Sequence, residues 1–345
     1  MHESTRGRPT ILTAVSGKLK PNQTRSIASN MLLISQICVG FGSTAIQTLT
    51  RYHNARISGR FRCPLCMGAC SLTAYIMKGG AVAKMDLIIP LAFAEIHVWL
   101  TFWEAIRDDR LLAAYRELLS AAEKVEESRF YFARDRHRYL VTRALVRTVL
   151  SRYASIDPKD WVFCTNAYGC PRVVNAQTTE RCPSFSVSHT QGLVILGIAE
   201  DRSLGVDVEN FATSDISNRL ADHFFAPQEL AALHEVPQHQ RLYRFLEYWT
   251  FKESYIKARG MGFSLPLDRF GFHFADDHSV DLVIDPELGD DSSRWQLWQF
   301  RPTPEHLLAV CAERLNAQSS KLLVRETIPT VSEKILAPGL LRTSP

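Results

Sequence analysis

The sequence predicts an α+β fold in which two subdomains of mixed helix and strand pack side by side. The 345 residues are enough for two domains. Their composition, 46% hydrophobic and 22% charged, is that of an ordinary globular protein. Beyond about residue 95, each half of the chain combines helical apolar spacing with short alternating segments, as α+β domains do.

The first 84 residues differ from the rest in charge. They contain eleven Lys and Arg residues and one acid, Glu3, whereas the remainder has 29 basic and 35 acidic residues. The apolar stretch 31–49 has too many polar interruptions to span a bilayer and begins too late for a secretory signal. The segment resembles an organelle-targeting leader only in composition. We expect residues 1–84 to be a poorly structured or spurious basic extension, and Met85 to begin the folded part.

Regular patterns begin shortly before His97. Residues His97–Thr101 alternate as a short strand, and Asp108–Ser120 has the apolar spacing of an amphipathic helix. A second helix is expected over Val141–Tyr153, and basic residues follow one another along and just before it. Such a face can be simply solvated, or it can grip an anionic ligand, and the spacing does not decide between these. The basic residues are Arg138, Arg143, Arg147 and Arg152.

Two further strands are expected over Phe185–His189 and Gly192–Ala199, and a third over Leu204–Asn210. In the third, Val206 and Val208 alternate with Asp207 and Glu209, so two carboxylates share one face. Neighbouring carboxylates repel each other, and Asp and Glu are not favoured in strands. The strand is therefore either a solvated edge or part of a cation site.

The stretch Arg244–Gly262 predicts a helix that ends at Gly260 in a left-handed cap, with cations in its last turn. On this helix Trp249, Glu253 and Lys257 are four residues apart and share one face. The simpler interpretation is a surface Glu–Lys pair beside a core Trp. The alternative is that Glu253 joins the two carboxylates of the acidic strand around Mg²⁺, with Lys257 facing a phosphate.

The remaining elements are weaker patterns. Helices are expected over Asp215–His223 and over Pro227–His234, which has Pro at its first turn. Residues 263–268 are expected to be extended, and residues 319–345 form a tail without a motif. Four short strands complete the prediction: Phe270–Phe274, Val280–Ile284, Trp295–Phe300 and His306–Cys311.

Together these blocks resemble a known family. Gly205-Val-Asp-Val-Glu209, followed by Trp249-Thr-Phe-Lys-Glu-Ser-Tyr-Ile-Lys257 and Gly-Phe-Ser-Leu-Pro-Leu-Asp268, is similar to the 4'-phosphopantetheinyl transferases of the Sfp type. The resemblance covers roughly residues 95–315. It implies two similar α+β subdomains packed as a pseudo-dimer: residues 85–202, which grip the nucleotide of coenzyme A, and residues 203–318, which carry the metal and catalytic residues.

The resemblance implies an enzyme that moves the 4'-phosphopantetheine arm of coenzyme A onto a serine of an apo acyl- or peptidyl-carrier protein and releases 3',5'-ADP. Mg²⁺ would be held by Asp207, Glu209 and Glu253. Glu253, directly or through a metal-bound water, would also be the general base, and Lys257 would neutralise or protonate the departing phosphate. Trp249 and Lys252 would support the site.

The expected contacts to coenzyme A depart in part from the family pattern. Phe185-Ser-Val-Ser-His189 is similar to a strand end whose Ser and His contact phosphates. Cys170 stands where a Lys is usual in the loop Tyr168-Gly-Cys-Pro171, and Glu123 and Glu126 stand where related enzymes have basic residues. The residues expected to contact coenzyme A are Arg138, Gly169, Arg172, Ser188, His189, Asp207 and Lys257.

Two other functions remain open at this point. A catalytically silent protein that binds coenzyme A or a carrier would explain the missing pocket cations. A metal-dependent nuclease would also use Asp, Glu and Lys, but the globular part is net acidic. Whether the carrier serves fatty acid, polyketide or nonribosomal peptide biosynthesis cannot be read from the chain.

Cysteine usage indicates where the protein works. Its eight Cys residues show no disulfide framework, and Cys63, Cys66 and Cys70, near His53, lack the second pair of a zinc finger. We therefore expect a reducing compartment, the cytoplasm. We also expect a monomer that binds neither membranes nor nucleic acid.

Overall fold

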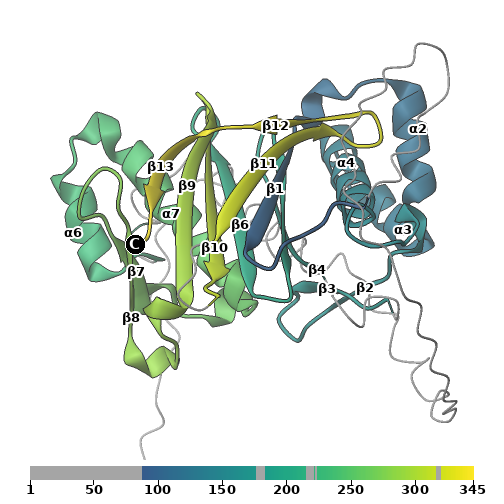
Figure 1. The fold of residues 1–345 in the computed structure, drawn as a ribbon. Helices are drawn as coiled ribbons and strands as arrows, with labels where there is room; N and C mark the ends of the chain where they lie inside the picture. Colours follow the sequence, from purple (N-terminus) through teal and green to yellow (C-terminus); the bar gives the residue numbers. More distant parts are fainter. Residues whose placement is uncertain (1–87, 176–182, 215–220, 222–223, 316–319) are drawn as a thin grey trace, which may run out of the picture.

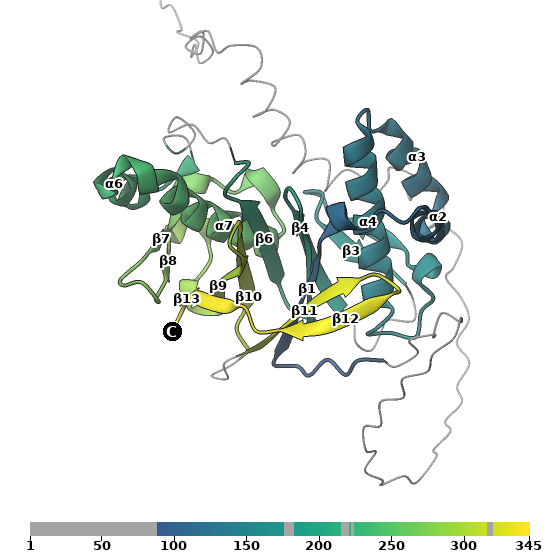
Figure 2. The same cartoon turned by 90° about the horizontal axis from the view of Figure 1, so that it is seen from above.

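A computed structural model describes residues 88–175, 183–214, 221, 224–315 and 320–345 of the chain. Two sheets lie side by side in the middle of the molecule, and helices cover the outer side of each (Figures 1 and 2). The α+β prediction, with two halves packed together, is confirmed. The predicted basic extension with its Cys and His residues, and nearly all of the helix expected over Asp215–His223, lie outside the described residues.

The first sheet has five strands in the order β12-β11-β1-β5-β4. β1 pairs antiparallel with β5 and parallel with β11, where Glu95 lies opposite Lys321. The strands span Glu95–Thr101 (β1), Pro183–His189 (β4), Val194–Glu200 (β5), Lys321–Ile328 (β11) and Ser332–Leu336 (β12). Residues 319–345, for which no element was expected, thus supply two of these five strands.

Helices α2 (Asp109–Leu118) and α4 (Ala133–Leu150) pack against this sheet, and α3 (Ala121–Arg129) packs against α4. α4 begins eight residues before the expected start at Val141. α3 was not expected, although a capping box begins it: Ser120 accepts from the backbone of Glu123, whose carboxylate accepts from the backbone of Ser120.

The second sheet has the order β13-β9-β10-β6. α7 (Arg241–Arg259) packs on β6 and β10, and α6 (Pro227–Glu235) packs beside α7. The predicted left-handed cap of α7 is confirmed, because Gly260 has φ +62°. The strands span Leu204–Asn210 (β6), Trp295–Thr303 (β9), His306–Glu313 (β10) and Gly339–Thr343 (β13).

Two small hairpins complete the fold. β7 (Phe270–His273) and β8 (Asp281–Ile284) lie where two strands were expected and pair with each other, whereas β2 (Phe163–Thr165) and β3 (Pro171–Val173) are too short to show alternation in the sequence. The expectation that residues 263–268 are extended is wrong. They include parts of two 3-10 turns, Gly262–Ser264 (η6) and Leu267–Arg269 (η7), in which local backbone hydrogen bonds replace a strand ladder.

Apolar side chains from both sheets form one continuous core between the two halves. Val98 and Ile195 of the first sheet pack with Val206 and Val310 of the second, and all four side chains are fully buried. The two halves therefore share a core, so β4 and β6 are held next to each other. In the described part of the chain, every helix is too short or too polar to cross a membrane.

Candidate active site

Gly205 sets the distance between strand β6 and helix α7. A Cβ atom on Gly205 would lie 1.9 Å from the carbonyl oxygen of Ser254 and 2.5 Å from the amide nitrogen of Ala258. Only glycine permits such an approach of a helix to a strand. The valines of β6 face the core between the sheets, so its acidic residues face α7, which carries Glu253 and Lys257.

Lys257 joins three elements at one point. Its Nζ atom donates to Oδ1 of Asp207 at 2.7 Å, to Oγ of Ser188 at 2.9 Å and to the carbonyl of Val206 at 3.2 Å. Ser188, on β4, donates to the same Asp207 oxygen at 2.7 Å. Burial acts to lower the pKa of Lys257, but the charges of Asp207 and Glu253 outweigh it and raise that pKa.

Three carboxyl groups surround this ammonium group. Glu253 is 2% exposed, and neither of its oxygens has a hydrogen-bond partner within the described residues; Oδ2 of Asp207 also has none there. Burial, with the charge of Asp207, raises the pKa of Glu253 to about 7 against the opposing effect of Lys257. Burial and the charges of Asp207 and Glu253 raise the pKa of Glu209 to about 8. The region thus holds more carboxyl groups than its single ammonium group neutralises.

A divalent cation fits the chemistry of these donors. A hard cation would stabilise the unpartnered carboxylate oxygens of Asp207 and Glu253 and would lower the raised pKa values of Glu209 and Glu253, and all three side chains offer oxygen ligands. In the part of the chain that the structure describes, however, no group of three or more Asp, Glu, His or Cys side chains is already arranged to hold a metal ion. Lys257 contacts Asp207 instead.

A histidine and an arginine border the site. His189, at the end of β4, has no hydrogen-bond partner for Nδ1 among the described residues. Burial lowers its pKa well below the usual value, and the charges of Arg138 and Lys257 lower it further. Arg138 comes from α4 and pairs with Asp135 at 3.0 Å. The charges of Arg138 and Lys257 thus both reach His189.

Gly169 and Arg172 come from the β2–β3 hairpin. Gly169 has φ +86° in the loop that joins the two strands, and Arg172 is exposed on β3. Among the described residues, no hydrogen bond or ion pair joins either of them to Lys257 or Asp207. The loop itself contacts the end of α7 through Asn166, which was not singled out from the sequence.

Comparison with known proteins identifies the family. A model of the 4'-phosphopantetheinyl transferase superfamily matches residues 203–311, and a model of the 4'-phosphopantetheinyl transferase N-terminal domain matches residues 101–201. The 4'-phosphopantetheinyl transferase Sfp of Bacillus subtilis (strain 168) is 32% identical over 198 residues, which cover 57% of this chain and 84% of that protein. The chain belongs to the 4'-phosphopantetheinyl transferases of the Sfp type.

Other proteins similar to this chain are also named phosphopantetheinyl transferases. The 4'-phosphopantetheinyl transferase HetI of Nostoc sp. is 32% identical over 169 residues, 49% of this chain and 70% of that protein. A phosphopantetheinyl transferase of Thraustochytrium sp. is 28% identical over 206 residues, 56% of this chain and 70% of that protein. The two family models meet between β5 and β6, where the chain passes from the first sheet to the second.

Two residues expected to support the transferase site have structural partners. Trp249 packs against Phe224 and Phe245, with ring centroids 5.9 and 6.0 Å away. Lys252 is fully buried, and its Nζ atom pairs with Glu229 at 2.8 Å and donates to the carbonyls of two residues after α7. Lys252 therefore fastens α7 to α6 and to the start of β7.

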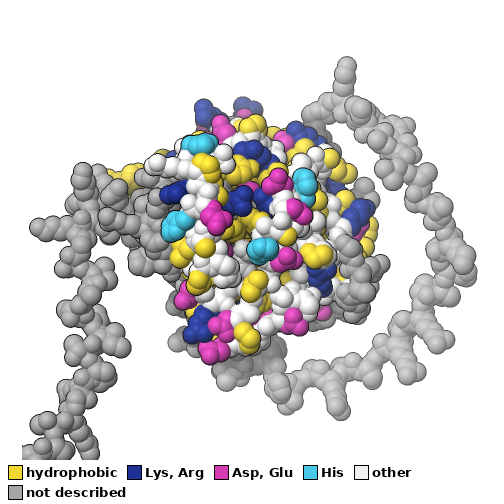
Figure 3. Space-filling model, turned by 90° about the vertical axis from the view of Figure 1, so that its left-hand side faces the viewer, with side chains coloured by type: hydrophobic (Ala, Val, Ile, Leu, Met, Phe, Trp, Pro, Cys, Tyr) yellow, Lys and Arg dark blue, Asp and Glu magenta, His cyan; other side chains and the backbone are white. Residues whose placement is uncertain are grey.

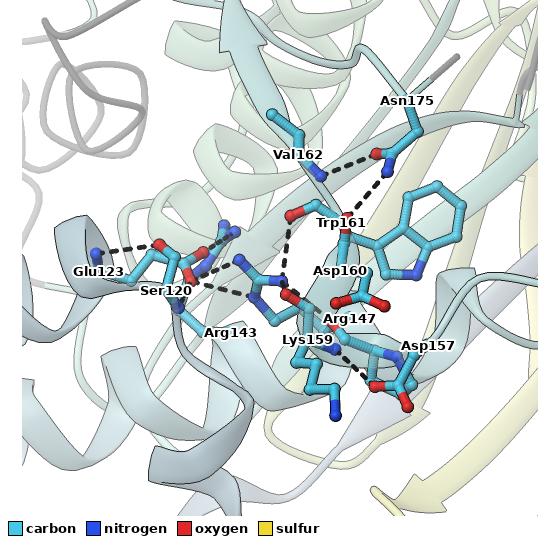
Figure 4. Close-up of polar contacts among 11 residues, drawn as sticks. Ser120, Glu123, Arg143, Arg147, Asp157, Lys159, Asp160, Trp161, Val162 and Asn175 are labelled. Carbon is cyan, nitrogen blue, oxygen red and sulfur yellow. Dashed lines mark hydrogen bonds and ion pairs between the residues drawn. The ribbon is translucent and has the colours of Figure 1, made fainter. Parts of the chain in front are cut away.

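Glu123, which was expected at a position where related enzymes have a basic residue, has a structural role. Glu123 is buried and forms ion pairs with Arg143 and Arg147 (Figure 4). The Nη1 atom of Arg147 donates to the backbone carbonyls of Pro158, Lys159 and Trp161. A solvated basic face, one of the two interpretations of this helix, is therefore wrong for Arg143 and Arg147, which are 5% and 1% exposed.

Proposed function

We propose that this transferase moves the 4'-phosphopantetheine arm of coenzyme A onto a serine hydroxyl of an apo acyl- or peptidyl-carrier protein and releases 3',5'-ADP. The observation that carries the proposal is the meeting of Lys257, Asp207 and Ser188 beside the unpartnered carboxyl of Glu253. The family membership supports it, since its members are named for this transfer.

Mg²⁺ would be held by Asp207, Glu209 and Glu253, where it would neutralise charge on the pyrophosphate of coenzyme A. The unpartnered oxygens of Glu253 and Asp207 are the observation in its favour. A cation bound to Asp207 would replace Lys257 as its partner. The ammonium group of Lys257 could then turn to a phosphate.

The cationic residues at the border of the site would hold the phosphates. Arg138 and Lys257 supply positive charge, and His189 supplies ring nitrogens for hydrogen bonds. Ser188 would keep Lys257 aimed at the reacting phosphate, because its hydroxyl contacts both Lys257 and Asp207. Gly169 and Arg172 would contact the cofactor from the hairpin.

In the transfer, the serine oxygen of the carrier forms a bond to the phosphorus that carries pantetheine, and the pyrophosphate P–O bond to the nucleotide breaks. Glu253 takes the serine proton. Its carboxyl group is free for this role, because neither of its oxygens has a hydrogen-bond partner among the described residues. Lys257 neutralises the charge that appears on the departing phosphate.

The test is transfer of labelled coenzyme A to a panel of apo carrier domains in the presence of Mg²⁺. Asp207→Asn and Glu253→Gln should abolish most of the transfer, whereas Glu235→Gln, an exposed acid at the end of α6, should leave it unchanged. Unchanged transfer by Asp207→Asn would overturn the proposed site. Binding of coenzyme A in calorimetry without transfer to any carrier would instead identify a silent binding protein.

The alternative of a metal-dependent nuclease predicts cleavage of plain DNA, which is tested by incubating the same preparation with DNA and Mg²⁺. The face that carries α6, β7 and β8 shows basic and acidic side chains interspersed, without one continuous basic field (Figure 3). The cytoplasmic location and the monomeric state stay predictions, to be checked by fractionation and by light scattering.

A further inference from the structure

The β2–β3 hairpin is held firmly at its base. Arg147, anchored by Glu123, donates to three backbone carbonyls between Pro158 and Trp161, just before β2 (Figure 4). Asn175, just after β3, accepts from the amide of Val162 at 2.7 Å and donates to the carbonyl of Asp160 at 2.8 Å. These contacts attach the hairpin to the first half of the molecule.

The tip of the hairpin is organised by one side chain, Asn166. Its Oδ1 atom accepts from the amides of Tyr168 and Cys170, both at 2.9 Å, and so closes the loop that contains Gly169. Its Nδ2 atom donates at 2.8 Å to the carbonyl of Gly260. The same amide group therefore shapes the loop and joins it to the other half of the molecule.

Gly260 is the C-cap of the helix that carries the active-site residues. Its amide donates to the carbonyls of Ile256 at 3.0 Å and Lys257 at 3.1 Å, so the cap belongs to the same turn as Lys257. A Cβ atom on Gly260 would lie 3.5 Å from Nδ2 of Asn166 and 3.6 Å from Sγ of Cys170. The loop is thus packed directly on the end of α7, within one turn of Lys257.

We propose that Asn166 is a positioning residue of the transfer reaction, which fixes the Gly169–Cys170 loop relative to Lys257. The inference rests on the proposed function, in which the loop contacts coenzyme A and Lys257 faces the departing phosphate. Asn166 then keeps a fixed distance between the nucleotide end of coenzyme A, which the loop contacts, and the ammonium group of Lys257. Small displacements of such groups lower the rate of a transfer reaction strongly.

The substitution Asn166→Asp separates the two contacts. A carboxylate keeps the acceptor for the amides of Tyr168 and Cys170, but it has no donor for Gly260 and places an oxygen against that carbonyl. We expect kcat to fall by about tenfold while the KM for coenzyme A changes less than about twofold. Asn166→Ala removes both contacts, so the KM should rise as well.

The matched control is Asn175→Asp, which makes the same chemical change at the base of the hairpin, away from α7. It should leave kcat within about twofold of the wild type. Equal losses of kcat in both variants, or an unchanged kcat in Asn166→Asp, would overturn the inference. If the wild type transfers no arm to any carrier, the proposed function fails instead.

A measurement on the unmodified chain covers the case in which Asn166→Asp does not fold. Amide hydrogen exchange is followed with and without coenzyme A and Mg²⁺. The inference requires that coenzyme A protects residues 166–170 and the turn 257–260 together. Protection of the loop alone, with the helix end unchanged, would contradict it.

Discussion

The Nζ atom of Lys257 lies 2.7 Å from Oδ1 of Asp207, although the two residues are 50 positions apart in the chain. This ion pair connects the last turn of α7 to the middle of β6. It also places the ammonium group of Lys257 where its charge lowers the pKa values of Glu209 and Glu253 against the effect of burial. Changes at this contact should therefore affect both the charge of the site and the transfer.

Lys257→Met should lower kcat by about a hundredfold to a thousandfold, because the departing phosphate loses its cation. The loss is measured by steady-state transfer to an apo carrier domain. Lys334→Met is the control, since Lys334 forms an exposed ion pair with Glu326 and its side chain is 62% exposed. An equal loss in both variants would show that Lys257 has no special role.

Glu253→Gln should lower kcat by about 10²- to 10⁴-fold without lowering the free energy of unfolding. The carboxyl group is buried without a partner within the described residues, so an amide of the same shape removes a costly charge. Transfer assays and urea unfolding on the same preparation check this. A marked loss of stability would mean that Glu253 serves the fold.

Glu123→Lys, which restores the charge usual in related enzymes, should destabilise the protein by about 3–5 kcal/mol, since it places a third cation beside Arg143 and Arg147. The free energy of unfolding in urea measures the effect. Glu126→Lys is the control: Glu126 pairs only with the exposed Arg129 among the described residues and should cost less than about 1 kcal/mol. Similar losses at both positions would contradict the structural role of Glu123.

Lys252→Met should also destabilise the protein by about 3–5 kcal/mol, because it leaves the carboxylate of Glu229 buried without its partner. Replacing both residues, as Lys252→Met with Glu229→Leu, should recover most of this loss. The comparison of the single and double variants by urea unfolding tests whether Lys252 acts through Glu229. A double variant that unfolds as easily as the single one would refute the pairing.

Asp290→Asn should destabilise the protein by about 1.5–3 kcal/mol at pH 7. Burial acts to raise the pKa of Asp290, but hydrogen bonds from Tyr255 and Trp295 and the charge of Arg259 lower it below the ordinary value. A depressed pKa stabilises the fold above pH 4 and ceases to do so as the pH falls through the folded-state value. The difference between wild type and variant should therefore shrink below about pH 4.

Much of this architecture follows from local patterns. The alternation of Val206 and Val208 with acids predicted β6, and the four-residue spacing of Glu253 and Lys257 predicted one face of α7. The capping box formed by Ser120 and Glu123 is a local signal for the start of α3, which the apolar spacing did not predict. What links these elements into a site came from the family resemblance.

Other contacts had no local signal. Glu123 meets Arg147 across 24 residues, and Asn166 meets Gly260 across 94. Neither the charge of a residue nor its spacing predicts such partners. As a result, Glu123 was interpreted as a changed pocket residue, and the hairpin tip as a cofactor loop alone.

The parallel pairing of β1 with β11 has a consequence for how the protein is made. Leu100 lies opposite Glu326, so β1 remains an open edge until the chain has been made as far as β11. Such distant pairings form slowly and leave sheet edges exposed while the chain grows. The first sheet is therefore completed only after β6, β9 and β10 of the second sheet have been made.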